Sequence, residues 1–156
     1  MKKQVLRNCI VLVLGVFAVQ AIASAQDARR LDGAWNVNVT LHDCTTGAVT
    51  RNIVALNLFT RDGSLTETAA SIQPGRTRGS SVGTWRHLRD DIFTSTFQFF
   101  RFNPDGSFFS RAKVTRVIEL SQDGSQFISN GTVEDFNAQD VSIGVSCPTE
   151  TASRAR

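Results

Sequence analysis

Hydrophobic and polar residues alternate one by one along much of this chain. In the stretch AWNVNVTLHD, at 34–43, apolar side chains occupy every second position and polar side chains occupy the positions between them. This period of two is typical of a β-strand with one dry face. The dry face of the expected strand carries Trp35, Val37, Val39 and Leu41. No segment shows the spacing of an amphipathic helix.

Turn signals separate the alternating stretches. Asp-Gly occurs at 62–63, 105–106 and 123–124, each time between apolar runs and each time followed by serine. This dipeptide tolerates the positive φ angles of tight hairpin turns. About eight strands result, and most of them are expected to pair with their neighbours in sequence. The pattern therefore predicts an all-β fold, an eight-stranded antiparallel up-and-down barrel.

The strand expected at 92–103 carries large apolar residues on both faces. One parity holds Phe93, Phe97 and Phe99, and the other holds Ile92, Phe100 and Phe102. Either a β-bulge near Phe99 and Phe100 turns the second set into the core, or one face carries an exposed aromatic patch. We favour the bulge, because closing a barrel needs local coiling and its core needs large side chains.

The next strand places a charged residue on its apolar face. That face is expected to carry Phe108, Ser110, Ala112, Val114, Ile118 and Leu120. Arg116 shares it, and an inward guanidinium needs a carboxylate or an anionic ligand group because it cannot neutralise itself. Glu134 or Asp135, on the following strand, is the natural partner. An internal salt bridge is the simplest interpretation, and a ligand anchor is the alternative.

The loops predict which end of the barrel is open. In a meander, alternate loops share one end, and the longer polar loops fall together. The longest, Ser71–Ser81, is expected to be a mobile flap that carries Arg76 and Arg78 beside the mouth of any cavity. A plain surface loop with solvated arginines is the other interpretation.

The first 25 residues predict a secretory signal peptide. Three basic residues precede an apolar run from Ile10 to Val19, and Ala23-Ser24-Ala25 is a small-x-small cleavage pattern. We expect cleavage after Ala25, which leaves residues 26–156 as a single domain in the periplasm or outside the cell. Without those three, the 17 Lys and Arg become 14, equal to the 14 Asp and Glu. This balance predicts neither a nucleic-acid partner nor insertion into a membrane.

Two cysteines, Cys44 and Cys147, follow the predicted cleavage site, and in an oxidising compartment they favour a disulfide. In an even-stranded closed meander the first and last strands pair antiparallel. A bond that places Cys147 opposite Cys44 then sets Arg154 opposite Val37 and Arg156 opposite Trp35. With no CxxC and only two histidines, we expect no metal site and no cofactor.

Gly33 and Trp35 form a G-x-W motif that resembles the first strand of lipocalins and the wider calycin group. The resemblance implies that Trp35 plugs one barrel end beneath an arginine from the last strand. The spacing of this motif, DCTTG, DGS and a late CPTET is also similar to a group of small secreted bacterial proteins. That likeness implies a fold and no reaction.

The catalytic signatures GxSxG and HExxH do not occur in the sequence. The leading hypothesis is a monomeric secreted barrel, not an enzyme, that binds a small, mainly apolar ligand. The candidate ligand-binding residues are Arg116, Phe97, Phe99, Phe108, Arg76 and Arg78. Two alternatives stay open. One is a barrel-cavity enzyme, a cyclase, isomerase or hydrolase, that uses an inward Arg–acid pair. The other is a structural or surface-interaction protein.

Overall fold

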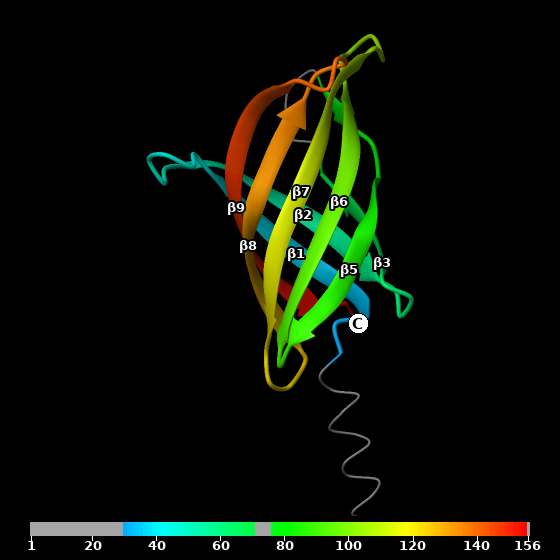
Figure 1. Cartoon of the computed structure of the whole chain (residues 1–156), viewed down its shortest axis with the longest axis vertical. Coiled ribbons are helices and arrows are strands. Elements are labelled where there is room, and N and C mark those ends of the chain that lie inside the picture. The colour runs from blue at the N-terminus through cyan, green and yellow to red at the C-terminus, as the bar shows by residue number, and fades with distance from the viewer. Residues whose placement is uncertain (1–29, 71–75, 156) are drawn as a thin grey trace, which may run out of the picture.

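Eight antiparallel strands close into a barrel, as predicted (Figure 1). The computed structural model describes residues 30–70 and 76–155, so the predicted signal peptide and part of the expected flap lie outside the described residues. The strands are β1 (Gly33–His42), β2 (Val49–Phe59), β3 (Ser64–Ala69), β4 (Thr77–Arg78), β5 (Ser81–Arg89), β6 (Ile92–Phe102), β7 (Phe108–Leu120), β8 (Gln126–Phe136) and β9 (Ser142–Arg154). The barrel strands pair in sequence order and β9 returns to β1, while the short β4 pairs with the end of β6. The described residues contain no helix, and hence none that could cross a membrane.

The three Asp-Gly-Ser sequences form the predicted hairpin turns. Their glycines, Gly63, Gly106 and Gly124, have φ angles of 88°, 82° and 67°. In each turn the aspartate carboxylate accepts the backbone N–H of the serine two residues later. These distances are 2.9, 2.9 and 3.0 Å for Asp62, Asp105 and Asp123. The conformational freedom of glycine and the carboxylate acceptor together explain why the same three residues recur.

Asp123 makes the stability of the β7–β8 turn depend on pH. Hydrogen bonds from the Ser121 hydroxyl and from the N–H and hydroxyl of Ser125 lower the pKa of its carboxyl from 3.8 to about 2. A depressed folded-state pKa contributes stability that is present above the unfolded pKa and lost as the pH falls through the folded pKa. Asp123→Asn keeps an acceptor oxygen and removes the charge.

We therefore expect the wild type to be more stable than Asp123→Asn at about pH 6, and the difference to vanish as the pH falls toward 2. Urea unfolding curves across this range measure it. A difference that stays constant with pH would contradict the prediction.

Aromatic rings close the barrel end at which β1 begins. Trp35 is fully buried, and its indole Nε1 donates to the Leu31 carbonyl at 2.9 Å. Its ring packs against Phe127 at 4.9 Å between centroids, and Phe127 contacts Phe59 at 6.2 Å. The Arg154 guanidinium lies 4.5 Å from the centroid of the Trp35 ring. Trp35 thus sits beneath an arginine of the last strand, as the resemblance implies.

The pairing of the first and last strands differs by two residues from the prediction. Arg154 lies opposite Trp35, and Cys147 lies opposite His42. The predicted register assumed that the bonded cysteines face each other across the ladder. Cys44 instead lies beyond the end of β1, in the turn to β2. The arginine above the plug is therefore Arg154 and not Arg156.

The expected bulge near Phe99 and Phe100 is absent, and the predicted inward positions of Phe100 and Phe108 were wrong. β6 alternates regularly there, so Phe99 is buried and Phe100 is 51% exposed. The β6–β7 register shifts later, between Arg101 and Phe102. This shift turns Phe108 outward, to 40% exposure, although it shares the parity of the inward Ser110. Phe100, Phe102 and Phe108 form an outer aromatic cluster, with ring centroids 6.0 to 6.5 Å apart.

Candidate ligand site

A buried ion pair crosses the middle of the barrel. Arg116 of β7 is 1% exposed; its Nη1 donates to Glu150 Oε2 on β9, and its Nε donates to Ser95 Oγ at 2.9 Å. The prediction of an inward guanidinium held by an acid is confirmed, but the expected acid was wrong. Glu150 of β9 is the acid that reaches Arg116, whereas Asp135 of β8 pairs with Arg101.

A second ion pair continues from the first toward the open end. Arg78 Nη2 donates to Glu67 Oε1, and also to Ser81 Oγ at 2.8 Å. Asn57 joins the two pairs in the amide orientation that satisfies both of its polar atoms. Its nitrogen then donates to Glu67 Oε2 at 2.9 Å, and its oxygen accepts from Arg116 Nη2 at 3.0 Å. One hydrogen-bonded row therefore runs from Glu150 through Arg116, Asn57 and Glu67 to Arg78.

Burial controls the ionisation of Glu67. Its removal from water raises the pKa of the carboxyl above 4.5, although the guanidinium groups of Arg78 and Arg116 act to lower it. Since desolvation is the largest of these effects, Glu67 takes up a proton more readily than an exposed glutamate does.

A cavity of about 50 Å³ lies beside this row, toward the open end of the barrel. It is formed inside the barrel, at the end opposite the Trp35 plug. Apolar side chains make most of its wall, among them Val39, Leu41, Phe97, Phe99, Val114 and Val133. Its charged side chains are Glu67, Arg78, Arg101 and Glu150.

Arg78 is the side chain best placed to contact a ligand. The pairing of β4 with β6 turns it into the barrel, where its side chain is 13% exposed, so the alternative of a solvated loop arginine was wrong. Its guanidinium carbon lies 3.6 Å from the Phe99 ring centroid, and that of Arg101 lies 5.2 Å from the same centroid. Arg78 Nε is buried and has no hydrogen-bond partner among the described residues. The site therefore offers an unused buried donor beside an aromatic wall.

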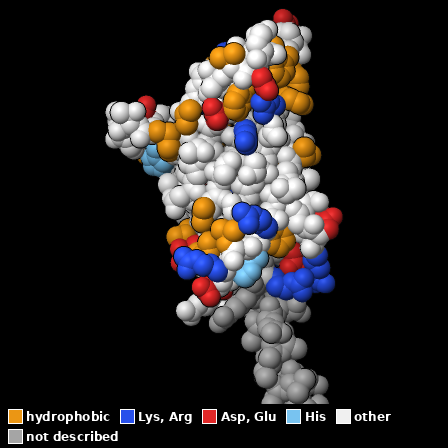
Figure 2. Space-filling view, in the orientation of Figure 1, with side chains coloured by type: hydrophobic (Ala, Val, Ile, Leu, Met, Phe, Trp, Pro, Cys, Tyr) orange, Lys and Arg blue, Asp and Glu red, His pale blue; other side chains and the backbone are white. Residues whose placement is uncertain are grey.

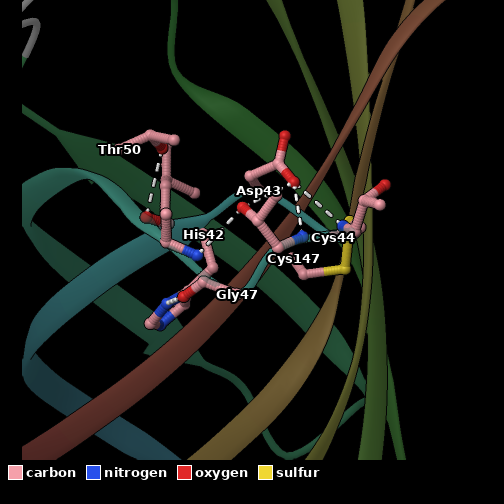
Figure 3. The surroundings of a disulfide bond; sticks show 10 residues. His42, Asp43, Cys44, Gly47, Thr50 and Cys147 are labelled. Atoms are coloured by element: carbon pink, nitrogen blue, oxygen red, sulfur yellow. Dashed lines mark hydrogen bonds between the residues drawn. A yellow bond between two sulfur atoms is a disulfide. The ribbon is translucent and has the colours of Figure 1, made fainter.

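A disulfide ties the turn between β1 and β2 to β9 at the same end of the barrel (Figure 3). Cys44 is bonded to Cys147 of β9 as predicted, with 5.1 Å between their Cα atoms. The Asp43 carboxylate holds the turn that carries Cys44, since it accepts the N–H groups of Thr45 and Thr46 at 3.0 and 2.8 Å. The neighbours of Cys147 in sequence, at 146 and 148, both line the cavity. The bond therefore fixes one wall of the site.

Three of the predicted ligand residues, Phe97, Phe99 and Arg78, meet at the cavity. Arg116 lies beneath it, with its donors directed to other protein groups. Phe108 lies outside the barrel, and Arg76 lies over the Phe109 ring, at 3.5 Å from its centroid. The cavity therefore contains only three of the six residues predicted to bind the ligand.

Three charged residues of the site, Glu67, Arg101 and Glu150, were not predicted from the sequence. The alternation of Leu65, Glu67 and Ala69 in LTETA is the signal that would have placed Glu67 inside. Arg101 follows the same inward parity as Phe97 and Phe99. Within residues 30–70 and 76–155, no group of three or more His, Cys, Asp or Glu side chains is placed to hold a metal ion. The chemistry that the site offers is polar recognition at Arg78 inside an apolar wall.

A closed eight-stranded antiparallel barrel fits a calycin-like fold. No protein-family model matches the chain, and no curated protein matches it. Among solved structures, the chain is similar to the crystal structure of Rv2717c from M. tuberculosis. The two share 12% sequence identity and a TM-score of 0.43 over 89% of this chain and 98% of that chain.

Proposed function

We propose that this protein is a secreted or periplasmic barrel that binds a small, mainly apolar ligand at its open end. One observation carries the proposal: an apolar cavity with a few converging charged groups lies opposite the plugged end. Ligand sites in proteins typically combine these features. The volume of about 50 Å³ is well below the roughly 300 Å³ of a pocket for a drug-sized molecule. The ligand is therefore small, or only its head group enters the barrel.

The compartment and the monomeric state belong to the same proposal. The Cys44–Cys147 disulfide is compatible with an oxidising compartment, and the predicted signal peptide would direct the chain there. Since one chain supplies the whole wall of the cavity, a single copy is sufficient for binding.

Native mass spectrometry of protein purified from the periplasm tests the proposal. We expect a small molecule to co-purify with the wild type and to be absent from Val133→Phe. Val133 is buried and lines the cavity, so the larger ring fills the space that the ligand needs. Circular dichroism checks that the variant is folded.

Val145→Phe is the matched control, because it adds the same ring to an exposed position of β9. It should retain the ligand as the wild type does. Equal retention by both variants, or a wild type that carries no small molecule, would contradict the proposal.

Surface interaction is the second candidate function, and the outer aromatic cluster of Phe100, Phe102 and Phe108 favours it. Figure 2 shows hydrophobic side chains gathered at the upper end of the visible face, over β6 and β7. Contiguous exposed apolar groups often mark protein interaction sites. Phe100→Ser with Phe108→Ser should remove this surface while the cavity stays intact, which separates the two functions.

A further inference from the structure

Arg78 carries a hydrogen-bond donor that no group of the described chain satisfies. Both of its hydrogen bonds run through Nη2, to Glu67 and to Ser81. Its Nε is buried and has no partner. A buried N–H without an acceptor loses its bonds to water and gains nothing in exchange. An acceptor that enters the cavity and reaches the Arg78 guanidinium, whose side chain is 13% exposed, would reduce this cost.

The carboxylates at the cavity, in contrast, already accept hydrogen bonds from protein donors. Glu67 accepts from Arg78 and Asn57. Glu150 accepts from Arg116 Nη1 and, at 2.6 Å, from the Ser129 hydroxyl. Among the described residues that line the cavity, the one buried polar side-chain atom without a partner is therefore a donor. This favours an anionic ligand group over a cation, and an ionised acceptor forms a stronger hydrogen bond than a neutral one.

The charged side chains around the cavity balance one another. Three arginines, Arg78, Arg101 and Arg116, face three acids, Glu67, Asp135 and Glu150, so the set is balanced. A bound carboxylate would be one negative charge in excess. Because burial already raises the pKa of Glu67, proton uptake by Glu67 restores the balance.

The cavity also limits the size of the ligand. A water molecule needs roughly 10 to 15 Å³ of this kind of volume, so about 50 Å³ admits about four water-sized groups. A carboxylate with one or two further carbon atoms is of about this size, so the end of a longer chain such as that of butyrate would extend through the open end of the barrel. The wall beside Arg78 is apolar, with Phe97, Phe99 and Val114 in position to contact such a chain.

We infer that the ligand of this cavity is a small monocarboxylate, whose carboxylate accepts from the Arg78 guanidinium and whose short alkyl chain lies against Phe97 and Phe99. The inference rests on the proposed function and narrows it to one chemical class.

Isothermal titration calorimetry at about pH 6 tests the inference with three probes of matched size, butyrate, butyramide and butylamine. At this pH butyrate is ionised, and Glu67 is closer to taking up a proton than at neutral pH. We expect butyrate to bind about ten- to a hundredfold more tightly than butyramide, the range for a hydrogen bond to a charged group. Butylamine should bind most weakly, because its charge repeats that of Arg78.

Arg78→Lys keeps a positive charge beside Glu67 and removes the Nε donor. We expect it to reduce the preference for butyrate over butyramide about tenfold. Arg76→Lys is the matched control, since this neighbouring arginine lies over Phe109 and does not line the cavity. It should keep the wild-type preference, and circular dichroism should show both variants folded.

Equal affinities of the wild type for butyrate and butyramide would overturn the carboxylate assignment and leave small-ligand binding intact. An undiminished preference in Arg78→Lys would overturn the role of Arg78. If no probe binds but a small molecule still co-purifies with the protein, the inference fails and the proposed function stands. If neither is observed, both fail.

Discussion

Arg116→Met is expected to lower the free energy of unfolding by about 3 to 5 kcal/mol. The substitution keeps a long side chain, but it leaves the Glu150 carboxylate buried in the barrel without its guanidinium. Ser95 and Asn57 lose their contacts with Arg116 as well. An uncompensated buried charge costs far more than the lost contact alone, because the group has also given up its hydration.

A double variant separates the charge from the hydrogen bonds. Arg116→Met with Glu150→Leu should recover most of the loss, because apolar residues of similar volume often replace a buried ion pair at little cost. Arg111→Met is the control on the same strand. Arg111 faces outward and pairs with Asp140, whose side chain is 76% exposed, so we expect a cost below about 1 kcal/mol.

Urea unfolding measures all three variants. If the single and double variants were equally destabilised, the hydrogen bonds of Arg116 to Ser95 and Asn57, and not its pairing with Glu150, would account for the lost stability.

The barrel could be predicted because its signals are local. Alternation decides the face of each residue within one strand, and an Asp-Gly-Ser turn fixes where the strand ends. Phe108 shows the limit of this reasoning. A shift of one residue between Arg101 and Phe102 reverses the face of every residue on one side of it. No local feature of the sequence marks that shift.

The charged interior was less predictable, because it depends on pairing between distant strands. Parity alone placed Arg116 inside, yet its acid came from β9, 34 residues away in sequence. Arg78 turns inward only because two residues, Thr77 and Arg78, pair with the end of β6. The predicted register of β9 was wrong by two residues. A disulfide can join residues that do not face each other in a ladder, and the prediction assumed that they do.

Removal of the Cys44–Cys147 disulfide is expected to cost about 4 to 5 kcal/mol. The two cysteines are 103 residues apart in sequence, so the bond restricts most of the barrel domain in the unfolded state. In the chain-entropy model the stabilisation grows with the length of the closed loop, and this loop is long. Urea unfolding of the variant with Cys44→Ser and Cys147→Ser, compared with the oxidised wild type, measures the loss.

Reduction of the wild type should give the same loss as the double variant, because both remove only the covalent link. The folded barrel should survive at low denaturant, since β1 and β9 pair from Trp35 and Arg154 up to His42 and Cys147 without it. A loss below about 1 kcal/mol would mean that the denatured chain is already restricted by residual structure. A loss well above 5 kcal/mol would mean that the bond also holds native contacts, beginning with the cavity wall beside Cys147.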